Sequence, residues 1–284
     1  MSLNPAIATE TRTPARLPGL LGLSLSRVGV ELKAFFRNPE AAFFNFSFPV
    51  LLLVIFASIF RDKIEGPPGE PSVSLSQYYV AGMLASGALT TAFQTLAISI
   101  SIEQHEGMLK RLEGTPLPKT AYFAGKIGLV TGVTIIQLCL MLAIGLVFYD
   151  LSLPTDPMKW LVLGSIGVMG VAGCCLLGIA FTRIVPNGRS APAMTTPIAV
   201  ILQFISGVFV PFDQIPGWLQ GVASVFPLRW MAQGLRYVFL PDWFKSEEVS
   251  GQWDLPIVFA VLGGWLVAGF VLAIVFFRWD RGQS

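Results

Sequence analysis

The chain has 284 residues, of which 54% are hydrophobic and 13% are charged, with 19 Lys and Arg against 17 Asp and Glu. Soluble proteins carry roughly 25% charged residues, so this composition and a mean hydropathy of +0.67 exclude an ordinary soluble globule. The small net charge of +2 and the lack of a Lys- and Arg-rich run give no indication of nucleic-acid binding.

The first strongly apolar run begins near Ala41, too late for a cleavable signal peptide, so we expect the mature protein to be the whole chain. Before this run, residues 20–38 have apolar side chains at helical spacing, with Arg27, Glu31 and Arg37 off the apolar stripe. The pattern predicts an amphipathic helix in the cytoplasmic interface, with Lys and Arg facing anionic headgroups. The alternative is a continuation of the first span. The stripe consists of Leu21, Leu25, Val28, Leu32 and Phe35.

Six apolar segments are long enough to cross a bilayer, which takes about 20 residues. None contains Asp or Glu, and the only Lys or Arg among them is Lys126, near the end of its segment and able to snorkel to the interface. We therefore predict an all-α membrane protein with six transmembrane helices in a single permease domain over residues 1–284. The segments are Ala41–Phe60, Tyr78–Ile102, Ala121–Tyr149, Trp160–Thr182, Ala191–Phe212 and Leu255–Phe277.

The basic residues predict the orientation of these spans. Placing both termini and the connections 103–119 and 183–190 on one side puts 13 of the 19 Lys and Arg residues there. Cytoplasmic loops are rich in Lys and Arg, so this side is predicted to be cytoplasmic.

Two connections are more than linkers. The loop 103–119 is charged and helix-forming as far as Glu113, and Gly114, Pro116 and Pro118 then break it. The outer stretch 211–254 is too apolar for a solvated loop, and Pro216 and Pro227 divide it. Backbone at membrane depth must satisfy its own hydrogen bonds, so this stretch predicts a hairpin of two short re-entrant or interfacial helices.

Glycines recur at helical spacing in two of the spans. Gly128 and Gly132 form a GxxxG pattern, and Gly164, Gly167, Gly170 and Gly173 repeat along the fourth span. Small residues allow membrane helices to approach closely, so we expect helix contacts there.

The sequence contains little that points to catalysis. The sole histidine, His105, cannot form a metal cluster alone, and the spans lack the carboxylates that ion-coupled transporters and intramembrane aspartyl proteases use. The three cysteines lie in apolar runs and indicate buried thiols. Lys126 lacks the surrounding residues of a P-loop. We expect no catalytic residue, metal or cofactor in this chain, and any energy source must lie in another chain.

Two segments resemble a known family. The pattern Glu103-x-x-Glu-Gly-x-Leu-x-Arg-Leu-x-x-Thr-Pro-Leu-Pro resembles the first cytoplasmic loop of type-two ABC exporter permeases. The stretches Phe204-Ile-Ser-Gly-Val-Phe-Val-Pro-Phe-Asp-Gln-Ile-Pro-Gly-Trp-Leu and Phe226-Pro-Leu-Arg-Trp-x-x-Gln-Gly-Leu-Arg236 are similar to the family's fifth span and extracellular hairpin. Daunorubicin-resistance-type drug exporters share this size and loop pattern.

The resemblance implies a subunit of the prokaryotic cell (inner) membrane, multi-pass, with both termini cytoplasmic. Two such permeases, identical or homologous, would pair in the lipid bilayer, and two soluble ABC ATPases carrying ATP and Mg²⁺ would dock beneath them. The loop 103–119 would then be the coupling loop, for which the alternative reading is a solvated charged loop. The predicted ATPase-coupling residues are Glu103, Glu106, Gly107, Met108, Leu109, Lys110, Arg111, Leu112 and Pro116.

The cargo path and the exit gate are expected from the same resemblance. Aromatic surfaces with few charges suit flat or lipid-like molecules. The predicted cargo-path residues are Phe44, Phe48, Phe93, Phe204 and Phe209. The predicted extracellular gate contains Pro211, Pro216, Trp218, Pro227, Arg229 and Arg236, whose arginines would bind headgroups or the segment's own acidic loops.

The predicted function is ATP-driven export of a hydrophobic drug or antibiotic, because the family supplies both the architecture and the direction. Export of a lipid or a lipid-linked polysaccharide stays open, since fold does not decide cargo. A non-transporting membrane sensor or assembly module is the alternative from another class.

Overall fold

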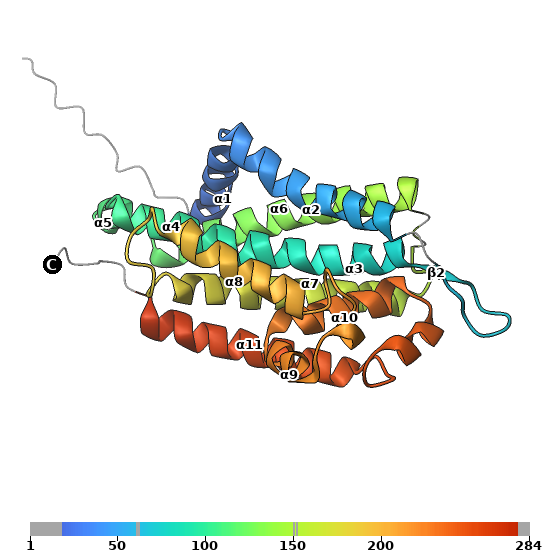
Figure 1. The fold of residues 1–284 in the computed structure, drawn as a ribbon. Coiled ribbons are helices and arrows are strands. Elements are labelled where there is room, and N and C mark those ends of the chain that lie inside the picture. Colours follow the sequence, from blue (N-terminus) through green and yellow to red (C-terminus); the bar gives the residue numbers. More distant parts are fainter. Residues whose placement is uncertain (1–18, 61–62, 150, 152, 278–284) are drawn as a thin grey trace, which may run out of the picture.

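The computed structural model describes residues 19–60, 63–149, 151 and 153–277. The long helices run roughly parallel, with the short helix α5 (Met108–Glu113) at one end and the hairpin of β1 (Lys63–Ile64) and β2 (Val73–Ser74) at the other (Figure 1). We call these the α5 end and the hairpin end. The predicted terminal segments 1–18 and 278–284 lie outside the described residues.

Within the described residues, five helical segments are long and apolar enough to cross a membrane. They confirm five of the six predicted spans. The second is continuous from Leu75 to His105 but contains a π-helical turn, η1 (Thr90–Gln94), between α3 (Leu75–Leu89) and α4 (Thr95–His105). The others are α2 (Pro39–Ile59), α6 (Lys119–Phe148), α7 (Pro157–Phe181) and α11 (Leu255–Phe276).

The remaining predicted span, Ala191–Phe212, is shorter in the structure. Helix α8 (Ala191–Ile205) has 15 residues and ends before Gly207, whose φ of 76° turns the chain. At 1.5 Å per residue, α8 is about 22 Å long, less than the ~30 Å hydrocarbon core. The six-span count is therefore not confirmed: apolar composition continues to Phe212, but the helix does not.

The outer segment contains the two short helices that its prolines predict. Helix α9 (Gly217–Val225) follows Pro216, and α10 (Pro227–Phe239) begins at Pro227. Single 3₁₀ segments, η2 (Phe212–Gln214) and η3 (Asp242–Glu247), flank them. Helix α10 packs on α3, α7 and α11 and is buried along almost its whole length. A re-entrant path for this hairpin is not confirmed.

The predicted interfacial helix is a separate element. Helix α1 (Leu20–Phe36) ends two residues before α2, and the Asn38 side chain caps α2 by accepting a hydrogen bond from the Ala41 N–H at 3.3 Å. A continuation of the first span is thereby excluded. Two details differ from the sequence interpretation, because Arg27 and Glu31 face the protein while Leu21 and Leu25 are exposed.

The GxxxG glycines lie against α1 rather than against another span. A Cβ added to Gly128 would overlap the Val28 side chain, and one added to Gly132 would lie 3.4 Å from Leu32 Cδ2. The expected helix contact is confirmed, and its partner is the amphipathic helix.

Only part of the glycine series in α7 makes such contacts. A Cβ on Gly170 would meet the Met231 side chain of α10, and one on Gly173 would lie 3.7 Å from the Leu266 backbone of α11. Gly164 and Gly167 have nothing within 4 Å. The close approach therefore belongs to the middle of α7.

We predict that Gly128→Leu destabilises the fold by about 2 kcal/mol, because the stiff β-branched Val28 cannot move away from the added side chain. Thermal unfolding in detergent measures the loss. Gly164→Leu, an identical change in open space, is the control, and equal losses in both variants would contradict the contact.

Candidate functional site

The loop between α4 and α5 turns sharply at one glycine. Gly107 has a φ of 70° and lies immediately before α5, so a side chain at this position would be strained although nothing lies within 4 Å of it. The loop therefore places α5 beyond the end of α4, at the tip of the bundle (Figure 1).

The predicted coupling residues divide into two groups. Leu109 is fully buried and holds α5 against the rest of the chain, and Glu103, Gly107 and Leu112 are partly buried. The others form a surface of mixed charge around α5, and we call these five the α5 surface. They are Glu106, Met108, Lys110, Arg111 and Pro116, all exposed.

A buried ionic network lies directly behind this loop. Lys126 of α6 is 1% exposed, and its Nζ pairs with Glu31 Oε2 of α1 at 3.0 Å and with Glu103 of α4. The Tyr122 hydroxyl donates to Glu103 Oε2 at 2.6 Å, and Arg27 Nη2 pairs with Glu31 Oε1 at 2.7 Å. Two cations and two carboxylates therefore join three helices without net charge.

This network corrects the sequence interpretation of Lys126 and Arg27. Neither side chain reaches toward headgroups, because the carboxylates of Glu31 and Glu103 lie within hydrogen-bond reach inside the protein. The sequence offered two signals, a single Lys near the end of a span and a Glu on the predicted amphipathic helix. Sequence spacing does not show that these helices are neighbours.

A groove of about 380 Å³ runs between α2, the η1 region and α8. Phe44 and Phe48 line it and are 68% and 50% exposed. Its other side has polar side chains, among which Gln94 Nε2 donates to Thr196 Oγ1 at 2.6 Å. The polar lining residues are Asn45, Thr90, Gln94, Thr95, Thr196 and Gln203.

Two buried polar atoms in this groove have no hydrogen-bond partner among the described residues. The side-chain oxygens of Asn45 and Gln203 are buried without a hydrogen bond, at a cost of about 1–3 kcal/mol each. The π-helical turn η1 is the kind of irregularity that recurs at functional sites. Unsatisfied acceptors in an apolar helical bundle are a reason to expect a ligand or another chain there.

The five predicted cargo-path phenylalanines do not share one site. Only Phe44 and Phe48 line the groove, whereas Phe93 lines a separate apolar cavity near α11, with its ring 5.3 Å from Phe181. Phe209 faces the hairpin end and stacks on Phe56, with 5.4 Å between the ring centroids. Phe204 makes an edge contact with Phe209, with 4.9 Å between the ring centroids.

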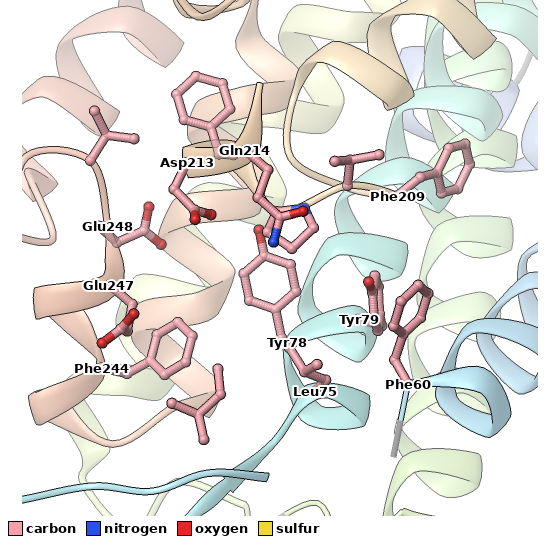
Figure 2. A pocket seen from close by; sticks show the side chains of 15 residues that line it. Phe60, Leu75, Tyr78, Tyr79, Phe209, Asp213, Gln214, Phe244, Glu247 and Glu248 are labelled. Atoms are coloured by element: carbon pink, nitrogen blue, oxygen red, sulfur yellow. The ribbon is translucent and has the colours of Figure 1, made fainter. Parts of the chain in front are cut away.

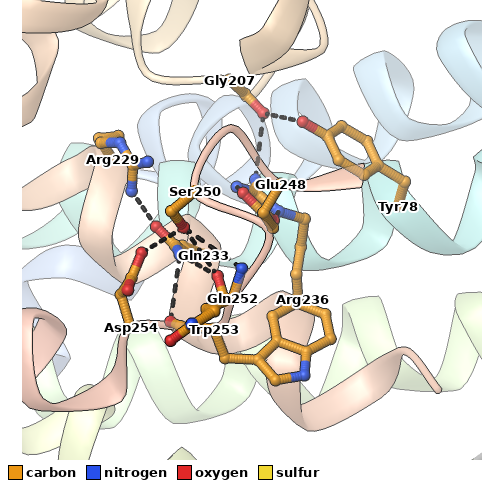
Figure 3. A network of polar contacts seen from close by, with 10 residues as sticks. All are labelled: Tyr78, Gly207, Arg229, Gln233, Arg236, Glu248, Ser250, Gln252, Trp253 and Asp254. Atoms are coloured by element: carbon orange, nitrogen blue, oxygen red, sulfur yellow. Dashed lines mark hydrogen bonds and ion pairs between the residues drawn. The ribbon is translucent and has the colours of Figure 1, made fainter. Parts of the chain in front are cut away.

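A second buried ion pair lies at the hairpin end (Figure 3). Arg236 is fully buried, and its Nε and Nη2 donate to the Glu248 carboxylate at 2.5 and 3.0 Å. Its Nη1 donates to the Gly207 carbonyl, which also accepts from the Tyr78 hydroxyl at 3.1 Å. Burial opposes the charged form of Arg236, but Glu248 outweighs it and the pKa of Arg236 is raised.

The remaining gate residues hold the short helices in different ways. Arg229 is buried, donates to Gln233 Oε1, and lies 4.3 Å from the Phe212 ring centroid. Gln233 Nε2 in turn donates to the Trp253 carbonyl at 3.1 Å. Burial lowers the pKa of Arg229 to about 10. Both arginines thus bind residues of the segment, and Arg236 also binds the Gly207 carbonyl outside it, while Trp218 is 72% exposed.

The gate prolines occupy helix starts. Pro211 precedes η2, Pro216 precedes α9, and Pro227 is the first residue of α10, where a missing N–H has no cost. Among the residues that the structure describes, no group of three or more His, Cys, Asp or Glu side chains is placed to hold a metal ion.

The chain is similar to several transport permeases. It is 24% identical over 237 residues to the inner membrane transport permease YadH of Escherichia coli K12, covering 82% of this chain and 87% of that protein. It is 23% identical over 251 residues to the putative transport permease ycf38 of Porphyra purpurea, covering 84% of each. It is 25% identical over 236 residues to the daunorubicin resistance ABC transporter permease protein DrrB1 of Streptomyces coeruleorubidus, covering 78% of this chain and 75% of that protein.

A family model described as ABC-2 type transporter matches residues 28–240. The match includes α1 from Val28, both faces of the groove, α5 and all of α10. With five helices suited to cross a membrane, the chain is a multi-pass membrane protein. It belongs to the ABC-2 type transporter family.

Proposed function

We propose that this chain is the permease subunit of an ATP-driven exporter that moves a hydrophobic drug or antibiotic out of the cell. The observation that supports this most directly is the α5 surface, an exposed short helix inside the family match and braced by buried charges. The 25% identity to DrrB1 favours a drug as cargo.

Coupling requires a stiff path from an ATPase to the spans. Movement of an ATPase is a rigid-body motion that only a well-anchored contact transmits. Leu109 anchors α5, and the Lys126 network fixes α4 to α1 and α6, so a push on the α5 surface moves three helices together. In this proposal the α5 end is cytoplasmic and two soluble ATPases dock there.

The first prediction concerns two glutamates at the α5 end. Glu106→Arg is expected to abolish cargo-stimulated ATP hydrolysis with thermal stability unchanged, because Glu106 is exposed. Glu103→Gln is expected to cost about 2 kcal/mol, roughly 4–8 °C in Tm, because the buried Lys126 loses one of its two carboxylate partners. The chain is co-purified with an ABC ATPase, reconstituted, and assayed against panels of drugs and lipids.

Glu70→Arg makes the same charge change as Glu106→Arg at an exposed position near the hairpin end and is the control. Gly107→Trp strains the positive-φ turn and is expected to behave as Glu106→Arg does. Normal cargo-stimulated hydrolysis by Glu106→Arg would contradict the coupling role. Stimulation by lipids and not by drugs would favour the lipid or lipid-linked polysaccharide cargo.

The groove suits the contact between two permease copies. Phe44, Phe48 and the unsatisfied acceptors of Asn45 and Gln203 face it together. A second copy would cover the aromatic surface and leave a partly polar path between the copies, in which a cargo could satisfy those acceptors. A two-fold pair places the same surface of each copy in contact.

We therefore predict that Phe48→Cys, in a Cys139→Ser background, forms dimers with a short bis-maleimide in membranes. Cys139 is exposed, which corrects the expectation of a buried thiol there, whereas Cys174 and Cys175 are buried and are not expected to react. Val168→Cys on α7, 71% exposed, is the control for random collisions and should stay monomeric. Denaturing gels measure the fraction of dimer, and equal yields from both variants would contradict this interface.

The segment 211–254 is proposed to close the exit side. Helix α10 packs on α7, and a Cβ at Gly170 would lie 3.1 Å from Met231 Cγ. In a Met231→Cys variant, Sγ takes the place of Cγ, and this spacing suits a disulfide between positions 170 and 231. The two helices can therefore be joined reversibly.

We predict that the double variant Gly170→Cys/Met231→Cys loses transport when the disulfide is oxidised and regains transport when it is reduced. The disulfide prevents α10 from moving relative to α7. Transport into vesicles is measured under both redox conditions, with each single variant as control. Full transport by the oxidised double variant would show that α10 does not act as part of the gate.

A further inference from the structure

A cavity of about 410 Å³ opens at the hairpin end, apart from the groove (Figure 2). Its walls come from the ends of α2 and α3, the turn 209–214 and the segment 244–249. Its volume lies within the range of small-molecule sites, which is roughly 300–1,000 Å³. The buried Arg236–Glu248 pair fixes the segment 244–249 against α10 and so maintains one wall.

The charged side chains that line this cavity are all acidic. They are Asp213, Glu247 and Glu248, and among the described residues that line the cavity there is no Lys, Arg or His. Arg236 neutralises Glu248. Asp213 and Glu247 are exposed and form no ion pair within the described part of the chain, although Asp213 also lies in the field of Arg236, so the cavity presents two carboxylates that no ion pair occupies.

Aromatic rings form much of the rest of the lining. Phe60, Tyr79 and Phe209 stand on one side, and Tyr78 and Phe244 on the other (Figure 2). Ring faces attract cations and also accept flat apolar groups. The combination of carboxylates and rings selects a molecule that has both a positive charge and an apolar body.

The hydroxyl of Tyr79 is one of the polar groups of the cavity that have no hydrogen-bond partner among the described residues. Tyr79 is 1% exposed, its ring contacts Phe56, Phe60 and Tyr78, and its hydroxyl makes no hydrogen bond to any described residue. Tyr78, by contrast, donates to Gly207. A hydroxyl that lines a cavity without a protein partner, on a side chain that is otherwise buried, is a position where a ligand N–H can be accepted.

We propose that this cavity binds an organic cation, a protonated amine carrying an aromatic or other flat apolar body. The ammonium group lies in the field of Asp213 and Glu247 and donates to the Tyr79 hydroxyl oxygen, while the apolar body packs against the rings. This is a ligand site in its own right, and it stands whether or not the groove carries cargo.

The test uses three probes with one apolar body and three charges: 4-phenylbutylamine, 4-phenylbutanol and 4-phenylbutyrate. Binding to the full-length chain in phosphatidylcholine nanodiscs is titrated by ligand-observed NMR, because a neutral lipid does not attract the cation electrostatically. We expect saturable binding of the amine, at least ~5-fold tighter than the alcohol, with the carboxylate weakest. Equal affinities for the three probes would overturn the proposal without any variant.

Two sets of variants locate the site. Asp213→Asn/Glu247→Gln is expected to weaken amine binding by about 5-fold and to leave the alcohol unchanged, since both side chains are exposed and outside the Arg236 pair. Glu65→Gln/Glu70→Gln removes two exposed charges near the same end but outside the cavity and is the matched control. Equal losses in both double variants would mean a general surface attraction and would overturn the site.

Tyr79→Phe removes only the hydroxyl and is expected to weaken amine binding by about 2–5-fold, as one hydrogen bond to a charged group predicts. Binding needs no ATPase, so a negative result here is distinguishable from failure of the proposed export function. Amine binding that has no effect on transport would still support the ligand site and would separate it from the cargo path.

Discussion

Charge burial is the constraint on which the arrangement of this chain depends. Lys126 lies in an apolar helix with 1% of its surface exposed, where an unpaired ammonium would cost several kcal/mol. Two carboxylates from two other helices, Glu31 and Glu103, offset that cost. The requirement fixes α1 beside α6 and α4 beside both, and it does so immediately behind the loop that positions α5. The glycines of α6 allow the same contact sterically, since Val28 of α1 occupies the space that a side chain at Gly128 would need.

The hairpin end follows the same rule with different residues. Arg236 lies on a short helix that is buried among three longer ones, and Glu248 reaches it from the following segment with two hydrogen bonds. The pair closes the segment 211–254 onto the spans and leaves a cavity whose remaining carboxylates, Asp213 and Glu247, form no ion pair with a described residue. Each end of the bundle thus has a buried ion pair that holds a peripheral element, α5 and its loop at one end and the 244–249 segment at the other. The groove lies between these ends and has unsatisfied polar atoms instead.

The sequence predicted elements well where a local rule decides them. Pro216 and Pro227 begin two helices because proline suits the first turn, and Gly107 precedes α5 because only glycine adopts its φ at little cost. The full length of the fifth predicted span is not confirmed, because composition and backbone diverge there. The residues after Ile205 are as apolar as a span, yet the turn at Gly207 ends α8, and the Gly207 carbonyl is held by Tyr78 and Arg236, residues distant in the chain. The cargo-path phenylalanines were chosen by type, and type does not show which cavity a ring faces.

By itself, the sequence determined that this is a helical membrane protein, that its short helices lie in two connections, and that its loop and hairpin patterns are those of a transporter permease. The first two properties follow from composition, periodicity and local motifs, and the third rests on the resemblance of two segments to a known family. Only the tertiary structure decided the partner of each buried charge and each glycine face, since Glu31 and Lys126 are 95 residues apart. It also decided that Asp213 and Glu247 line one aromatic cavity. Contacts between distant segments are set by how whole helices pack, and the free energy of an ion pair depends on burial, which no local pattern records.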